Sequence, residues 1–302
     1  TVTEESDGSV TAAGGLYSAG IGGIDSISGG TVTVNGGTMT AAGGSGGAGI
    51  GGGKAGSGGA VTVNGGNLTV TGGIGSAGIG SGVVTDTDTV NVSGGTVTVN
   101  GGNIIATGGY FGAGIGCGQG GIGGTITVNS GTVTASGGNS GAGVGGGLNG
   151  SCGTVTVNGG NVTATGGNQA SGIGNGDVAS SGSAAVTVNG GNVNAIGGLH
   201  GAGIGDGANG SGATFSTGEN GNAVIVASSI SDQSGKASTG TTPWSGLIIE
   251  GTTGALYGTS VTPTADFTVP AGDTVTLGND DTAAQTLTVA SGITMTNNGD
   301  IT

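Results

Sequence analysis

Basic residues are almost absent from this sequence. Its 302 residues include two lysines, Lys54 and Lys236, one histidine and no arginine, against sixteen acidic residues, so the formal net charge is -14. So acidic a surface repels phosphate backbones and anionic lipids, which excludes nucleic acid and anionic membranes as partners. No run of about 20 apolar residues exists, so we expect no membrane insertion. The acidic surface, rich in Thr, Asn and Ser, predicts an extracellular location at a cell surface.

Proline and cysteine are also scarce. Three prolines and 83 glycines without an every-third-residue phase argue against a collagen helix. The two cysteines, Cys117 and Cys152, both lie in Gly-rich sequence. A disulfide between them is one alternative in an oxidising environment, and two free thiols are the other. Neither cysteine belongs to a C-x-x-C pair or has a nearby histidine, so we expect no metal or redox site at these cysteines.

The sequence does contain a repeat. Thr31-Val32-Thr33-Val34-Asn35-Gly36-Gly37 returns in nearly the same form at 60–66, 96–102, 125–131, 154–160 and 185–191. Counted between equivalent Val or Ile residues from Val2 to Val186, the steps are 30, 29, 36, 29, 29 and 31 residues. A fixed period near 29 indicates a repeat architecture.

Each repeat has three parts. Residues 154–158 alternate polar and apolar side chains, which is typical of a half-buried strand, and after a Gly-Gly turn residues 161–165 do so again. The third part, Ser171-Gly172-Ile173-Gly174, places one aliphatic side chain in a backbone of small residues, as close backbone approach requires. We therefore predict an all-β fold, a right-handed parallel β-helix (β-solenoid) with coils of about 29 residues.

Two other folds compete with this prediction. Asn-Gly between alternating runs is also a signal for an antiparallel hairpin, but a hairpin leaves the Gly-Ile-Gly part without an equally good role. A bundle of polyglycine helices is the second alternative, and Thr-Val-Thr-Val favours strands instead.

The repeat divides the chain at about residue 212. Residues 1–212 predict seven Gly-rich coils. In residues 213–302 glycine becomes rarer, the 29-residue step ends, and short strands alternate with turns. We expect less regular solenoid coils there, with a small separate β domain as the alternative. Neither end carries an evident polar cap, so we expect a piece of a longer protein or a subunit whose ends meet other copies.

An asparagine recurs at the end of the first strand in six coils. Asparagine tolerates the left-handed backbone conformation that a bend needs, and stacked amides can bond to one another. We therefore predict a ladder of Asn35, Asn64, Asn100, Asn129, Asn158 and Asn189.

The run Gly-Gly-Thr-Val-Thr-Val-Asn-Gly-Gly-Asn-Val-Thr-Ala-Thr-Gly-Gly, followed by Gly-Ala-Gly-Ile-Gly, resembles the Gly-rich repeats of very large cell-surface proteins of Gram-positive anaerobes. Residues 213–302 are similar to the segment that often follows those repeats. The coil pattern more distantly resembles clostridial carbohydrate-binding parallel β-helix domains, which bind cellulose and acidic sugars and carry calcium. Those domains tend to have Asp-Asp-Gly-Ile-His where this chain has Gly-Ala-Gly-Ile-Gly.

Catalysis is disfavoured by the inventory of side chains. Lyases with this fold need Arg or Lys as base, and its glycoside hydrolases need carboxylates grouped around the sugar. Both lysines lie in loop-like sequence, most acids are scattered, and His200 has no Ser or Cys motif around it. We therefore predict a protein that is not an enzyme.

Binding residues are predicted in two kinds of place. Clustered carboxylates suit calcium, the one cofactor considered, at Asp86 and Asp88 in the long 36-residue step and at Asp280 and Asp281 in a turn. The variable position before Gly-Ile-Gly forms an edge that suits a glycan or a protein, with Trp244 as a further platform for a sugar ring. The edge candidates are Tyr17, Tyr110, Phe111 and His200. The alternative is that these bulky side chains cover thin Gly backbone or, for Trp244, the end of the core.

Outward threonine pairs such as Thr96/Thr98 and Thr125/Thr127 would form a regular hydroxyl array, which resembles the ice-binding face of some antifreeze solenoids. Threonine is also simply a good outward strand residue. Taken together, we predict a structural repeat protein, an adhesin stalk or a filament subunit that joins copies of itself end to end or extends a larger surface protein. Carbohydrate binding is the first alternative and ice binding the second.

Overall fold

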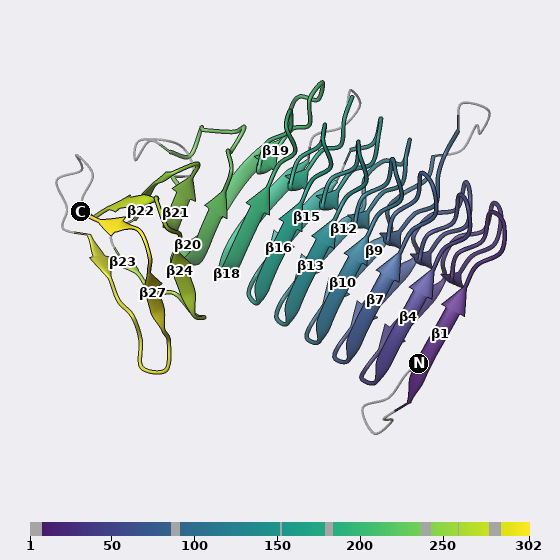
Figure 1. The fold of residues 1–302 in the computed structure, drawn as a ribbon, viewed down its shortest axis with the longest axis horizontal. Coiled ribbons are helices and arrows are strands. Elements are labelled where there is room, and N and C mark those ends of the chain that lie inside the picture. The colour runs from purple at the N-terminus through teal and green to yellow at the C-terminus, as the bar shows by residue number, and fades with distance from the viewer. Residues whose placement is uncertain are drawn as a thin grey trace.

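The computed structural model describes residues 8–85, 91–151, 153–178, 184–236, 243–258, 260–277 and 285–302 (Figure 1). Every regular element in these ranges is a β-strand. The same ranges contain no helix of the length and hydropathy needed to cross a membrane. The all-β prediction is therefore confirmed.

The strands recur in three walls that run along the molecule. The first wall contains β3 (Thr31–Val34), β6 (Ala60–Val63), β9 (Thr96–Val99), β12 (Thr125–Val128), β15 (Thr154–Val157) and the first half of β18 (Ala185–Ile196). The second wall contains β1 (Ser9–Ala13), β4 (Thr38–Ala42), β7 (Asn67–Thr71), β10 (Asn103–Thr107), β13 (Thr132–Ser136), β16 (Asn161–Thr165) and the second half of β18. The third wall contains β2 (Ile21–Gly22), β5 (Ile50–Gly51), β8 (Ile79–Gly80), β11 (Ile115–Gly116), β14 (Val144–Gly145), β17 (Ile173–Gly174) and β19 (Ile204–Gly205).

In all three walls each strand pairs in parallel with the strand one coil later. The register keeps equivalent residues together, as in Ile126 beside Val155 and Val133 beside Val162. It also survives the 36-residue step, where Val61 pairs with Val97. The chain is a parallel β-solenoid of about nine turns of roughly 29 residues.

The inward side chains form one continuous hydrophobic core. In each regular coil two side chains from the first wall, two from the second and one from the third are buried, as with Val155, Val157, Val162, Ala164 and Ile173. A single coil has too few of these to form a core alone. The stability of the fold therefore comes from contacts between neighbouring coils.

The third wall needs glycine because its backbones lie in close contact. Gly51 has a φ of 136°, and a Cβ atom built on it would lie 2.0 Å from the carbonyl oxygen of Gly80 in the next coil. No side chain fits at that distance, and L-residues rarely adopt that φ. The Gly-Ile-Gly motif therefore buries one aliphatic side chain, and its glycine backbone packs too closely against the next coil to carry a second side chain.

The remaining strands form the C-terminal part of the chain. They are β20 (Thr214–Ala227), β21 (Gly246–Glu250), β22 (Thr253–Tyr257), β23 (Ser260–Val261), β24 (Phe267–Val269), β25 (Thr274–Thr276), β26 (Thr286–Leu287), β27 (Met295–Asn297) and β28 (Asp300–Ile301). Parallel pairing continues from β18 to β20 and from β20 to β21, and Phe215, Ile225 and Ile248 belong to the same core as the earlier coils. Coil stacking therefore crosses residue 212.

Beyond β21 the topology changes. β22 runs antiparallel to β21, and β25 and β28 extend the sheet from β22 in parallel. A second hydrophobic core joins Val224 and Leu247 to Leu256, Phe267 and Val269. Since Ile225 and Ile248 face the first core, Val224 and Leu247 lie on the outer face of the coils, where the C-terminal strands cover them.

Candidate binding surfaces

The recurring asparagines form a continuous amide ladder along one corner. The side-chain Nδ2 of each asparagine donates to the Oδ1 of the preceding one. The donor-acceptor distances are 2.7 Å (Asn64 to Asn35), 2.9 Å (Asn100 to Asn64), 2.8 Å (Asn129 to Asn100), 2.8 Å (Asn158 to Asn129) and 2.8 Å (Asn189 to Asn158). Each inner amide both donates and accepts, which ties successive coils together.

The backbone conformation predicted for these asparagines was wrong. None of the six has a positive φ; the left-handed residue is the glycine two positions later, such as Gly131 with a φ of 89°. The intervening position has no positive φ, and in one coil it is Ser130, whose hydroxyl donates to the backbone carbonyl of Asn100. Asparagine is therefore needed at this corner for its amide and not for its backbone.

The variable edge displays the predicted aromatic residues, but far apart from one another. Tyr17 is 40% exposed and Tyr110 57%, Phe111 is half-buried, and His200 is exposed. They belong to the first, fourth and seventh coils, and at ~4.8 Å per coil neighbouring members are about 14 Å apart. Only Tyr110 and Phe111 touch, edge to face, with ring centroids 4.7 Å apart.

Tyr17 shows what such a side chain does for the coil itself. Its ring lies 3.2 Å from the position that a Cβ would have on Gly46 in the next coil, and Lys54 Nζ is 5.8 Å from the ring centroid. The ring therefore covers thin glycine backbone, which is the alternative role considered for this edge. Tyr110, the more exposed ring, keeps most of its surface open to a ligand.

The prediction that Trp244 offers a platform for a sugar was wrong. Trp244 is only 2% exposed, and its ring packs against Phe215 and Tyr257 with centroid distances of 5.3 Å to each. The coils from residue 213 onward have larger side chains and fewer glycines, so this indole fills the end of the core. Its Nε1 is buried, with no hydrogen-bond partner among the described residues.

The calcium candidates Asp86, Asp88, Asp280 and Asp281 lie outside the described residues, and calcium binding stays a prediction. Cys152 lies outside them as well. Cys117 is a free, fully buried thiol whose Sγ donates to the carbonyl oxygen of Gly123 at 2.9 Å. Burial raises the pKa of the Cys117 thiol to about 12. Both alternatives for the pair, a disulfide and two free thiols, stay predictions.

The outward threonines form columns with interruptions. Thr33, Thr62, Thr98, Thr127, Thr156 and Thr187 make an unbroken column on the first wall. The neighbouring column contains alanine at Ala60 and Ala185, so on the first wall paired threonines occur in the coil of β3 and in three consecutive coils, those of β9, β12 and β15. Ice binding stays a prediction that a thermal-hysteresis measurement tests.

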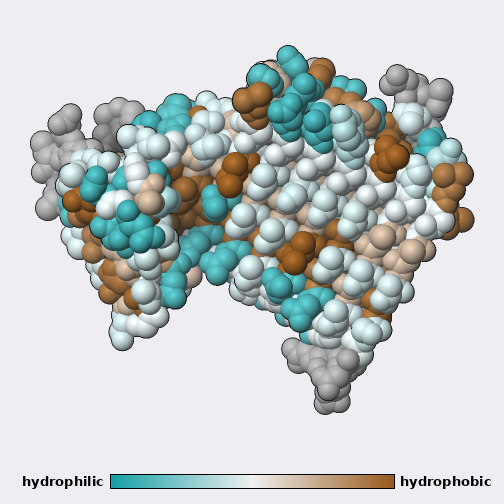
Figure 2. Space-filling view, in the orientation of Figure 1, coloured by the Kyte–Doolittle hydropathy of each residue, from teal (hydrophilic) through white to brown (hydrophobic). Residues whose placement is uncertain are grey.

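A groove that sequence reasoning missed lies where the C-terminal strands meet the outer face of the coils (Figure 2). Its volume is about 300 Å³. One side consists of Asn161, Thr163, Asn192 and Asn194 from β16 and β18, and the other includes Asp266, Phe267, Thr268 and Pro270 from the segment around β24. Val162 of β16, Val193 of β18, and Val224 and Val226 of β20 complete the lining.

Two contacts hold the groove together. The Nδ2 atom of Asn192 donates to Asn161 Oδ1 at 3.2 Å and to the backbone carbonyl of Asp266, which ties the C-terminal segment to the seventh coil. The Oδ1 atom of Asn192 is buried and has no partner among the described residues. The sequence signal for this groove is Val224-Ile225-Val226. Three consecutive apolar residues replace the alternation of polar and apolar side chains, which indicates that both faces of β20 are buried.

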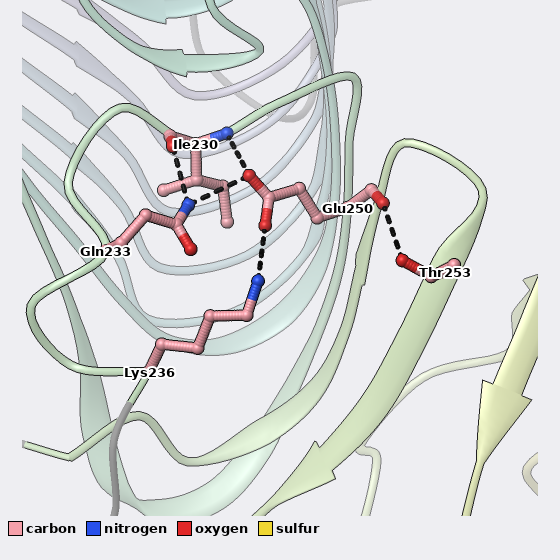
Figure 3. A network of polar contacts seen from close by, with 5 residues as sticks. All are labelled: Ile230, Gln233, Lys236, Glu250 and Thr253. Atoms are coloured by element: carbon pink, nitrogen blue, oxygen red, sulfur yellow. Dashed lines mark hydrogen bonds and ion pairs between the residues drawn. The ribbon is translucent and has the colours of Figure 1, made fainter.

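A carboxylate network closes the third wall at its C-terminal end (Figure 3). Glu250 Oε1 accepts hydrogen bonds from the backbone N–H of Ile230 at 2.9 Å and from Gln233 Nε2 at 2.8 Å, and its Oε2 accepts one from Lys236 Nζ at 3.0 Å. The hydrogen bond to Glu250 is the main cause that raises the pKa of Lys236. These contacts fix residues 230–236 against Glu250 at the end of β21, which is a structural role.

Comparison with known proteins supports the repeat assignment. A family model described as a beta helix repeat matches residues 6–25, 61–83, 97–119, 126–148, 155–177 and 186–208. These segments follow the coils of the solenoid, since all but the first start within a first-wall strand. No curated protein and no solved structure gave a significant match to the chain.

Proposed function

We propose that this chain is a non-enzymatic structural rod that extends an extracellular surface protein. The observation that carries the proposal is the regular coil-to-coil register up to β18, with parallel pairing in all three walls and the amide ladder along one corner. Such a stack transmits force through many parallel hydrogen bonds, and each further coil adds ~4.8 Å of rigid length. The strand β1 and the C-terminal strands lie at opposite ends of the molecule, as a spacer requires (Figure 1).

The scarcity of catalytic groups supports a role without chemistry. The sequence has no arginine, and within the described ranges no three His, Cys, Asp or Glu side chains form a group that could hold a metal ion. Incubation with acidic and neutral polysaccharides tests this part of the proposal. We expect no new reducing ends and no unsaturated sugar products, and either product would overturn it.

Location and mechanics are tested separately. An antibody against the chain should label intact source cells, and labelling that appears only after permeabilisation would refute an extracellular role. In an optical trap, pulling on the two ends should lengthen the protein in multiples of about 100 Å, because one coil of roughly 29 residues extends by ~3.3–3.6 Å per residue. Stretching without discrete steps would show that the coils do not act as load-bearing units.

Assembly into filaments is the stronger form of the proposal. End coils that pair through their backbone edges would extend the stack without a new type of contact. Electron microscopy of the purified chain at increasing concentration distinguishes the two forms. Filaments are expected for a self-assembling subunit, whereas single short rods at every concentration would restrict the function to that of a spacer.

Carbohydrate binding at the edge is the second candidate, and the exposure of Tyr110 favours it. A ring that is 57% exposed and held edge to face by Phe111 offers a preorganised surface for the C–H face of a sugar. A glycan array should then show binding that Tyr110→Ala abolishes. Tyr17→Ala is the matched control, because the Tyr17 ring already covers Gly46. Equal loss in both variants would count against a Tyr110 site.

A further inference from the structure

β24 has one paired edge and one free edge. β27 pairs in parallel with β24, where Phe267 N–H donates to Thr294 and Val269 C=O accepts from Asn298. In a parallel ladder alternate residues bond to the same neighbour, so the N–H and C=O groups of Thr268 point to the opposite side. No described residue provides a partner for either group, and Thr268 is exposed.

The free edge of β24 opens onto the groove. Thr268 lines it together with Asn161 and Thr163, which belong to the coil before the one that Asp266 contacts. The groove therefore offers room for a short extended segment beside Thr268, above the outer faces of β16 and β18 and next to the Asp266 carbonyl, to which Asn192 already donates. Figure 1 shows β24 between β27 and these coils.

The lining of the groove indicates which occupant it fits. An unpaired strand edge is a template for another extended backbone. The wall formed by the coils carries amide and hydroxyl groups, which suit polar side chains, and Val224, Val226 and Pro270 suit apolar ones. Asp266 is the one ionisable side chain of the lining, in a chain of net charge -14, so an acidic segment and a second copy of this chain are both repelled.

We propose that an extended, neutral or basic peptide segment of a partner protein docks in this groove as an added strand on the free edge of β24. The pairing uses the N–H and C=O groups of Thr268. Polar side chains of the added strand face Asn194 and Thr163, and apolar ones face Val226. The site is distinct from the edge that carries Tyr110 and does not depend on the rod function.

The first test measures the free edge directly by hydrogen exchange. Without a ligand, the Thr268 amide should exchange rapidly, while the amide of Val269, which the register places against β27, should be protected. Addition of the synthetic probe acetyl-Lys-Thr-Val-Thr-Val-Thr-Lys-amide should slow exchange at Thr268. A Thr268 amide that is protected in the free protein, or unchanged at millimolar probe, would overturn the proposal.

The second test uses a matched pair of substitutions. Thr268→Pro removes the free N–H and places a ring at the open edge without removing a bond to β27, so probe affinity should fall at least about tenfold. Thr268→Ala keeps the backbone donor and should bind within about twofold of the unmodified protein. Equal affinity of the two variants would refute strand pairing.

A third variant keeps the test valid should Thr268→Pro fail to fold. Thr163→Trp fills the groove from the outer face of β16, away from the C-terminal strands, and should also abolish probe binding. A version of the probe with glutamate in place of both lysines should bind more weakly, and the difference should shrink in high salt. Tighter binding of the acidic peptide, or binding of neutral oligosaccharides at this groove in place of peptide, would overturn the assignment.

Discussion

Replacing Asn129 with alanine removes two rungs of the amide ladder at once. Asn129 donates to Asn100 at 2.8 Å and accepts from Asn158 at 2.8 Å. A hydrogen bond contributes about 0.5–1.5 kcal/mol net, and exposed amides regain water, so each rung belongs at the lower end of that range. We expect Asn129→Ala to lower the free energy of unfolding by about 1 kcal/mol.

The end of the ladder supplies the matched control. Among the described residues Asn35 takes part in one rung, as acceptor from Asn64, so Asn35→Ala should cost about half as much. Urea denaturation followed by circular dichroism gives both values, with an unchanged m-value as the condition for comparing them. Equal losses in the two variants, or no loss at Asn129, would refute the claim that the ladder bonds stabilise coil stacking.

Asn129→Asp keeps the shape of the side chain and removes its amide donor, so it distinguishes the contribution of the hydrogen bond from that of the side-chain shape. The introduced carboxylate puts an acceptor in place of the Nδ2 donor, opposite Asn100 Oδ1. At neutral pH this variant should therefore be less stable than Asn129→Ala. The protonated carboxyl group can donate again, so the loss should shrink as the pH falls through the raised pKa of the new group. A loss that is independent of pH would show that the two oxygens do not face each other.

Three further outcomes follow from the structure. Gly51→Ala should prevent stable folding, because its Cβ would lie 2.0 Å from Gly80 O, whereas Gly15→Ala, with no atom within 4 Å of the new methyl group, should change the melting temperature little. Around Asp232, desolvation raises the pKa, but hydrogen bonds from the Phe215 N–H and from Ser234 outweigh it and lower the pKa below 3.8. The stabilisation is present above pH 3.8 and is lost as the pH falls through the lower folded value, so urea titrations of Asp232→Asn and the unmodified chain should converge in acid. Cys117, with its pKa of about 12, should resist iodoacetamide at pH 8 until the chain unfolds, and mass spectrometry of its peptide checks this.

Local pattern was enough to predict the regular coils. Alternation at 154–158 and 161–165 placed Val155, Val157 and Val162 inside, and the structure buries all three. The amide ladder was predictable for the same reason, since a repeat that stacks in register brings like residues together. The backbone conformation of the corner was not predictable from the sequence. Both Asn129 and Gly131 suit a bend, and only the coil geometry decides which of them takes the positive φ.

The candidate sites were harder to predict because they depend on contacts between distant segments. Trp244 follows a loop-like stretch in the sequence, yet Phe215 and Tyr257 enclose it. The groove needs Asp266 to reach Asn192, a contact across 74 residues of sequence. No periodicity within one coil encodes a contact of that kind.

The sequence by itself determined the period, the inward and outward faces and the acidic surface, because each depends on side-chain order and composition alone. The tertiary structure decided that the last strands fold back over the outer face of β20 and β21 and leave one edge of β24 open beside the coils. The physical reason is that β20 and β21 are apolar on both faces: Ile225 and Ile248 face the first core, whereas Val224 and Leu247 face outward. Burial of the outward side chains requires a second layer, and only the packed chain shows which segment provides it.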